Sequence, residues 1–278
     1  MLSPVPSVEH RGMNTRVLII VYGTVAYLTF VAAFLYAIGF TGNIGVPRSV
    51  DHGIHAPLGE ALAVNVALLG LFAVQHSVMA RPGFKRWWTR FVATSVERST
   101  YVLIASVVLF VVFWQWRTMP AAVWDMTSPI WRAAAWSAFW LGWATVLAAS
   151  FMISHFELFG LRQAYLAWRG RKPNINNGFR TPLLYRLVRH PLMVGFLIAF
   201  WSAPRMTTGH LVFAIATTGY ILIAVQFEER DLAASLGQPY REYRRRVPML
   251  VPRPGFATRR GRADRAARGK GGVRAPAR

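Results

Sequence analysis

Long runs of apolar residues separated by short polar segments dominate the chain from residue 17 onward. A helix needs about 20 apolar residues to cross a bilayer. Several runs approach that length, and the last two are joined by a break at Pro204-Arg205. The pattern predicts an all-α integral membrane protein with about six transmembrane helices, the last two forming a C-terminal helical hairpin. The expected helices are residues 17 to 40, 61 to 80, 100 to 116, 133 to 154, 191 to 203 and 209 to 227.

Charge gives the predicted helices an orientation. The chain has 32 Lys and Arg against 11 Asp and Glu, yet 54% of its residues are hydrophobic. A basic excess suits a nucleic acid, but its placement suits a membrane, because Lys and Arg are enriched in cytoplasmic loops. With six crossings and the N-terminus inside, all but four basic residues fall inside. We therefore expect a multi-pass protein of the bacterial inner membrane with both termini cytoplasmic and no specific nucleic acid partner. The four exceptions are Arg48, Arg117, Arg132 and Arg205.

The remaining composition sets the domain boundaries. There is no cysteine, which excludes disulfides, thiolate metal sites and a cysteine nucleophile. His52 and His55 have a spacing that could share a metal, but a solvated loop is the better interpretation, so no metal site is predicted. We expect residues 1–16 to be a cytoplasmic segment and 17–252 the membrane domain. The basic tail, 253–278, is expected to be disordered and to contact anionic lipid headgroups, with a solubilising role as the alternative.

The hairpin is expected to bring charged groups together. Pro191 can begin a helix, whose free N–H groups would face an anion. Two antiparallel arms return the chain to the side it left, which predicts that Arg189 and His190 lie beside Glu228 and Glu229. Carboxylates at a helix C-terminus oppose the macrodipole, so these acids should have a cationic partner from the protein or a ligand.

This region also carries a family resemblance. Arg-His-Pro-x-x-x-Gly from Arg189, an apolar hairpin, then Glu-Glu-x-x-Leu-x-x-x-x-Gly-x-x-Tyr-x-x-Tyr-x-x-x-Val-Pro from Glu228 resemble the membrane methyltransferases of the isoprenylcysteine carboxyl methyltransferase superfamily. The resemblance implies a cytosolic cofactor-binding cap over about residues 155–252, which holds S-adenosyl-L-methionine as methyl donor. The residues it places around the cofactor are Gln163, Asn177, Gly178, Phe179, Arg180, Tyr185, His190, Pro191, Leu192, Met193 and Glu228.

The physical fit of these residues to the cofactor is reasonable. The helix N-terminus and Arg189 can receive the methionyl carboxylate, and Glu228 or Glu229 can receive the methionyl ammonium. Aromatic faces suit the adenine or the sulfonium cation. The tyrosines that offer such faces are Tyr185, Tyr240 and Tyr243, for which interface packing is the alternative.

Motifs in the first two-thirds of the chain narrow the resemblance to the nurim-like branch. Within it, they resemble the bacterial enzymes that methylate methanethiol to dimethyl sulfide, over about residues 17 to 252. Isoprenylcysteine enzymes tend to carry a basic residue one turn before the glutamates, where this chain has Ala224-Val225-Gln226, so a prenylated carboxylate acceptor is not expected. The motifs are Leu35 to Phe40 with Gly42-Asn43, Gln75 to Arg81, Glu97 to Tyr101, and His155 to Gln163.

The chemistry of a thiol acceptor suggests the catalytic residues. The thiolate is the nucleophile, so the enzyme must remove a proton or stabilise the anion near the sulfonium. Ionisable groups at the cytoplasmic ends of the predicted helices are the candidates. We expect a His to take the proton, an Arg to stabilise the thiolate and a Glu to orient the base. The alternatives are His76 or His155, Arg98 or Arg162, and Glu97 or Glu157.

Other functions remain open from the sequence. The acceptor could be another thiol or a lipid group, because no motif fixes it. A non-catalytic nurim-like membrane scaffold is the alternative outside the enzymes. Binding of S-adenosylmethionine separates the enzymes from the scaffold.

Overall fold

A computed structural model describes residues 12–171 and 181–252 of the chain as a bundle of helices. Among the described residues, five helices are long and apolar enough to cross a membrane, and a shorter apolar helix, α8, spans Pro191–Trp201. The predicted spans agree with these helices to within a few residues at most ends. The five are α1 (Met13–Gly42), α2 (Leu58–Ala80), α4 (Thr94–Gln115), α5 (Pro129–Ile153) and α9 (Thr208–Leu236).

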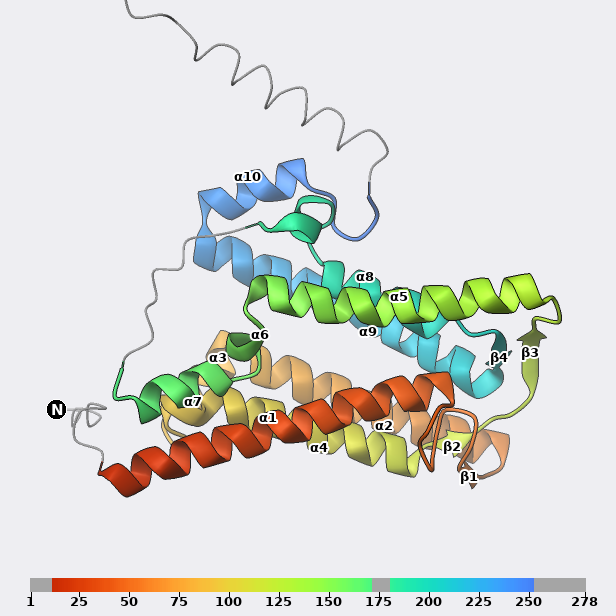
Figure 1. The fold of residues 1–278 in the computed structure, drawn as a ribbon, viewed down its shortest axis with the longest axis horizontal. Coiled ribbons are helices and arrows are strands. Elements are labelled where there is room, and N and C mark those ends of the chain that lie inside the picture. The colour runs from red at the N-terminus through yellow and green to blue at the C-terminus, as the bar shows by residue number, and fades with distance from the viewer. Residues whose placement is uncertain (1–11, 172–180, 253–278) are drawn as a thin grey trace, which may run out of the picture.

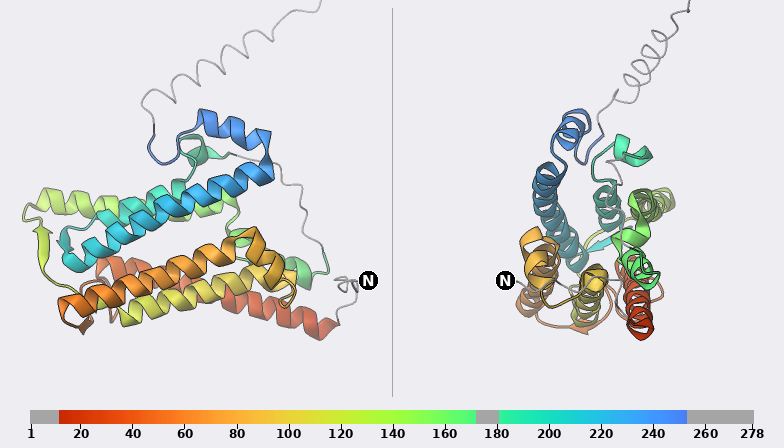
Figure 2. Two further views of the ribbon diagram at one scale, coloured as in Figure 1. Left: turned by 180° about the vertical axis from the view of Figure 1, so that it is seen from behind. Right: turned by 90° about the vertical axis from the view of Figure 1, so that its left-hand side faces the viewer.

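The helices form two rows of three (Figures 1 and 2). One row contains α1, α2 and α4, and the other contains α5, α8 and α9. Aromatic side chains join the rows: Phe34 of α1 meets Trp143 of α5 with ring centroids 5.2 Å apart, and Phe40 meets Phe213 of α9 at 5.8 Å. Large apolar side chains also cover the outside of the bundle, such as Leu18, Ile130 and Leu141, as lipid contact requires.

Short strands lie at one end of the bundle, which we call the strand end. They are β1 (Ile54–His55), β2 (Arg117–Thr118), β3 (Ala122–Asp125) and β4 (Arg205–Thr207). β1 pairs in parallel with β2, and β3 pairs antiparallel with β4. The hydropathy pattern did not predict these strands. His52 and His55 also lie here, and their rings contact two different hydroxyls, those of Ser49 and Thr118, each at 3.1 Å.

The opposite end, which we call the basic end, carries the short helices (Figure 1). Here α2 meets α9 through an ion pair between Arg81 and Asp231, at 3.0 Å. A sharp turn at Gly160, with φ +85°, brings α7 against α4, and a Cβ there would lie only 2.6 Å from the Ser99 nitrogen. The elements are α3 (Pro82–Trp88), α6 (His155–Leu158), α7 (Leu161–Trp168), the 3-10 helix η2 (Leu183–Arg186) and α10 (Gln238–Arg246).

The C-terminal hairpin is present, with three differences from the expectation. α8 has only 11 residues, about 16 Å of helix, and extended residues 202 to 207 carry the chain on to the strand end. The stretch before His190, which lies outside the expected helices, contains the short 3-10 helix η2. α9 continues for about two turns past Glu229 to Leu236, so the two glutamates do not stand at a helix C-terminus. The helix dipole therefore does not explain why Glu228 and Glu229 need cationic partners.

Glycines allow α5 and α8 to pack closely. A Cβ on Gly195 would lie 2.7 Å from the Gly142 oxygen, and a Cβ on Gly142 would lie 2.6 Å from the Ala199 nitrogen. Both distances are too short for any side chain, so the two backbones touch, as they do where small residues line membrane helix crossings. Gly195 is the glycine of the Arg-His-Pro-x-x-x-Gly motif, and its role is to seat α8 against α5.

We predict that Gly195→Ala lowers the stability of the folded protein, whereas Gly70→Ala does not. The extra methyl at position 195 must separate two backbones, a strain of about 1 to 3 kcal/mol. A Cβ at Gly70 meets no atom within 4 Å, and alanine favours a helix. Thermal unfolding in detergent micelles checks this, and equal midpoints for the two variants would contradict the account of the crossing.

Candidate functional site

A buried carboxylate organises the basic end. The side chain of Glu229 on α9 is only 3% exposed, and its Oε1 accepts hydrogen bonds from Arg189 Nε at 2.7 Å, His190 Nε2 at 2.9 Å and the Tyr240 hydroxyl at 2.8 Å. Arg244 Nε lies 3.3 Å from Oε2. A buried charge is costly unless cations and donors surround it, so this cluster ties η2–α8 to α9 and α10.

Arg189 in this cluster donates from two of its nitrogens to groups of the protein. The Arg189 side chain is 9% exposed, and its Nη1 donates to the carbonyls of Arg244 at 2.9 Å and Val247 at 2.6 Å. The backbone N–H groups of Arg189 and His190 donate to the carbonyls of Pro248 and Met249. The Val-Pro end of the sequence motif therefore lies against its Arg-His start.

Glu228, the neighbour of Glu229, has a different environment. Its side chain is 48% exposed, and its Oε2 lies 3.5 Å from His190 Nδ1. The predicted proximity of His190 to both glutamates is thus present in the structure. Burial alone would lower the pKa of His190, but hydrogen bonds to Glu228 and Glu229 outweigh burial and raise it. Glu228 therefore keeps carboxylate surface that a ligand can reach.

The predicted tyrosines, Tyr185, Tyr240 and Tyr243, lie close to the glutamate cluster. The Tyr243 hydroxyl donates to the Tyr185 carbonyl at 2.6 Å, and the Tyr240 and Tyr243 rings are 5.8 Å apart. Burial raises the pKa of Tyr243 to about 12. Burial also raises the pKa of Tyr185, with a further contribution from the charge of Glu228. Pro191 begins α8 as predicted and is buried, while Leu192 and Met193 are half-buried on its first turn.

A second group of polar side chains lies in the row of α1, α2 and α4, around His76 on α2. The Tyr101 hydroxyl on α4 is 2.8 Å from Nε2 and 3.1 Å from Nδ1 of His76, and it can hydrogen bond to only one of them at a time. The Arg98 guanidinium lies over the Tyr101 ring at 5.1 Å, and its Nε donates to the Leu158 carbonyl at 2.8 Å. The Tyr220 ring of α9 lies 6.5 Å from that of His76. His76 therefore has one ring nitrogen that Tyr101 leaves free, and Tyr101 in turn contacts Arg98.

His155 has no nitrogen available. Its Nε2 is 2.9 Å from the Tyr27 hydroxyl and its Nδ1 is 2.9 Å from the Ser150 hydroxyl, with the ring 6% exposed. The ring stacks on Phe151 at 4.2 Å and is packed by Phe159 at 4.8 Å. Burial lowers the pKa of His155. This environment fits a ring that joins α1, α5 and α6.

Among the described residues, no side-chain hydrogen bond or ion pair joins the remaining predicted residues to these two groups. Arg162 and Glu157 form an ion pair in which both side chains are more than a third exposed. Gln163 Nε2 donates to the Glu157 carbonyl at 3.1 Å, and its buried Oε1 has no partner among the described residues. Glu97 is half-buried in the first turn of α4. Four further candidates lie outside the described residues: Asn177, Gly178, Phe179 and Arg180.

Sequence reasoning missed several side chains that complete these groups. Tyr101 was placed at the correct level but given no role, and Tyr220, whose hydroxyl is 3.4 Å from that of Ser77, was not identified. A polar side chain inside an apolar run was the available signal for Tyr220 and for Tyr27. No local pattern could pair them with their partners.

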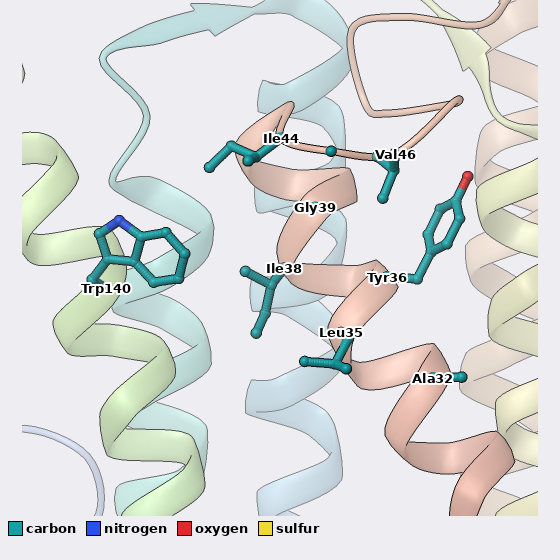
Figure 3. A pocket seen from close by; sticks show the side chains of 9 residues that line it. Ala32, Leu35, Tyr36, Ile38, Gly39, Ile44, Val46 and Trp140 are labelled. Atoms are coloured by element: carbon teal, nitrogen blue, oxygen red, sulfur yellow. The ribbon is translucent and has the colours of Figure 1, made fainter.

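Two apolar pockets lie away from these groups. One, of about 350 Å³, opens beside α1 toward the strand end (Figure 3). Its wall includes Leu35, Ile38, Val46 and Trp140, and the one ionisable side chain on it, Tyr36, donates its hydroxyl to the Arg48 carbonyl at 3.1 Å. Such an apolar surface suits lipid, whereas the chemically active groups lie at the basic end.

Comparison with known proteins gives this arrangement a family context. Residues 64–235 match the family model described as NnrU protein. The chain is 66% identical to a methanethiol S-methyltransferase of Mycobacterium tuberculosis over 86% of this chain and 98% of the relative. It is 57% identical to methanethiol S-methyltransferase 2 of Bradyrhizobium diazoefficiens, over 89% and 95%. Nurim of Mus musculus is 30% identical over 68% of this chain and 78% of nurim. No solved structure matches.

We predict that Glu229→Gln destabilises the fold far more than the same change at Glu228. Removing the buried charge leaves Arg189 and Arg244 facing a neutral group, which costs about 2 to 4 kcal/mol by analogy with broken buried ion pairs. Glu228→Gln changes a half-exposed residue and should shift stability by less than about 0.5 kcal/mol. Thermal unfolding of both purified variants measures the difference, and equal losses would show that Glu229 does not hold the basic end together.

Proposed function

The chain belongs to the NnrU protein family and groups with its methanethiol S-methyltransferases, and on this premise we propose that it methylates methanethiol to dimethyl sulfide with S-adenosylmethionine as the methyl donor. The observation that carries the assignment of a site is the half-exposed Glu228 carboxylate. Glu228 lies beside His190 at the start of the hairpin, and its helix, α9, also carries Tyr220, whose ring centroid is 6.5 Å from that of His76. α9 thus runs from a group suited to the donor to a group suited to the thiol.

The donor would be held at the start of the hairpin. We assign its ammonium to Glu228, because Oε1 of the buried Glu229 already accepts three hydrogen bonds and its Oε2 faces Arg244 at 3.3 Å. For the same reason, Arg189 is a poor ligand for the methionyl carboxylate. The unpartnered Oε1 of Gln163 is a further polar group that fits a ligand donor. Bound S-adenosylmethionine supplies an electrophilic methyl group.

We assign the proton transfer to His76. A base needs a free nitrogen, and Tyr101 occupies only one nitrogen of His76, whereas Tyr27 and Ser150 occupy both nitrogens of His155. The Tyr101 hydroxyl accepts a hydrogen bond from the N–H of one ring nitrogen, which fixes the tautomer and leaves the lone pair on the other nitrogen. The other nitrogen takes the thiol proton and later releases it to water.

The nearby arginine supports the same assignment. Arg98 is held by the Leu158 carbonyl and the Tyr101 ring, and its charge favours the thiolate over the thiol. Arg162 is neutralised by Glu157 and half-exposed, so its charge is less able to stabilise a thiolate. Phe72 is stacked on His76 at 5.1 Å and the Tyr220 ring lies 6.5 Å from it, so aromatic rings flank the proposed base.

Membrane placement follows from the same features. We propose that the basic end faces the cytoplasm, where Lys and Arg are enriched, and that the strand end faces the other side. Methanethiol and dimethyl sulfide are small and apolar enough to pass through the bilayer. The basic tail, residues 253–278, lies outside the described residues, and we retain its contact with anionic headgroups as a proposal.

We predict that His76→Ala lowers turnover at neutral pH by about 10²- to 10⁴-fold, the usual worth of a positioned base. Part of the loss should return at raised pH, because solution then supplies thiolate. His155→Ala should lower thermal stability and leave the turnover of the folded fraction much closer to that of the original protein. Initial rates across pH for both variants test this assignment. Unchanged turnover of His76→Ala at every pH would exclude His76 as the base.

The activity itself has a direct test. Purified protein supplied with S-adenosylmethionine and methanethiol should release dimethyl sulfide into the headspace, and calorimetry should show saturable donor binding that Glu228→Gln weakens. Donor binding without dimethyl sulfide would indicate another acceptor. The absence of both would contradict the proposed function and favour a scaffold.

A further inference from the structure

The connection between α2 and α4 forms a distinct surface at the basic end (Figure 1). It runs from Arg81 to Ala93 and contains the short helix α3. Because a candidate membrane span ends immediately before it and another begins immediately after it, its residues lie at the level where lipid headgroups meet the acyl chains. We call residues 81–93 the α3 connection.

Cations without carboxylate partners mark the α3 connection. It contains four basic residues and no Asp or Glu. Arg81 pairs with Asp231, but among the described residues no carboxylate lies within ion-pair distance of Lys85, Arg86 or Arg90. Arg86 and Arg90 are exposed, and Lys85 is half-buried. This surface has an excess of positive charge that an anion would relieve.

Exposed aromatic rings accompany the cations. Phe91 is 72% exposed and Trp87 is 47% exposed, and their ring centroids lie 5.5 Å apart. On the other side of the Trp87 ring, Phe84 and Trp88 pack toward the bundle. Rings of this kind, between cations at the end of a membrane span, prefer the interface between headgroup and acyl chain.

We propose that the α3 connection is a docking surface for anionic phospholipid, with Lys85, Arg86 and Arg90 binding the headgroup phosphates and Trp87 and Phe91 lying between the glycerol backbones. Charge complementarity and the location of the connection at the bilayer surface select this occupant. The connection also joins the helix of His76 to that of Arg98, so a lipid held here would fix the spacing between these two proposed active-site residues.

The test is competition between lipids for the purified full-length protein. Native mass spectrometry from micelles containing equal amounts of phosphatidylglycerol and phosphatidylcholine should find phosphatidylglycerol retained preferentially. The double variant Arg86→Gln/Arg90→Gln should weaken that retention on the order of tenfold, since each cation near the surface contributes to the attraction.

The matched control removes two exposed charges from α10 at the same end, in Arg241→Gln/Arg245→Gln, and should keep the preference. If both double variants lost the preference for phosphatidylglycerol equally, net charge alone would explain it, and the proposal would be overturned. A preference unchanged in Arg86→Gln/Arg90→Gln would overturn it as well. Protein dimers that disappear in Trp87→Ala/Phe91→Ala would assign the surface to a second copy of this chain instead.

Discussion

The basic end of this protein depends on one buried negative charge. Glu229 is 3% exposed near the end of a long apolar helix, where an unpaired carboxylate could not remain ionised. Arg189 and His190 reach it from the start of α8, and Tyr240 and Arg244 reach it from α10. Segments that are distant in the sequence must therefore meet at one point. That requirement explains why the charged and aromatic motif residues lie at the two ends of the apolar hairpin.

This use of Glu229 determines what its neighbour can do. Adjacent residues on a helix point about 100° apart, so Glu228 lies outside the buried cluster while remaining next to His190. A carboxylate held close to the His190 ring but still 48% exposed is a suitable receptor for a ligand ammonium. The helix of Glu228, α9, also carries Tyr220, whose ring lies 6.5 Å from that of His76 in the other row. Of the two adjacent glutamates, Glu229 thus holds the basic end together, and Glu228 is left for the proposed donor.

Much of this architecture could be predicted from the sequence, because long apolar runs and a proline at a helix start are local signals. Pro191 begins α8 as expected, and the hairpin brings His190 to Glu228. Hydropathy failed where structure continues into polar sequence, since α9 runs on through Arg230 and Asp231 to Leu236. It also gave no sign of strands only two to four residues long. Pairings such as Tyr27 with His155, 128 positions apart, have no local signature at all.

The central claim is that donor and thiol meet at the basic end, between Glu228 and His76. The most direct measurement is a structure of the protein bound to S-adenosylhomocysteine, the spent donor. The account predicts that the amino group of this ligand contacts the Glu228 carboxylate and that its sulfur is directed toward His76. Density for the ligand in the apolar pocket beside α1, or at the basic end with Glu228 free of contact, would contradict it.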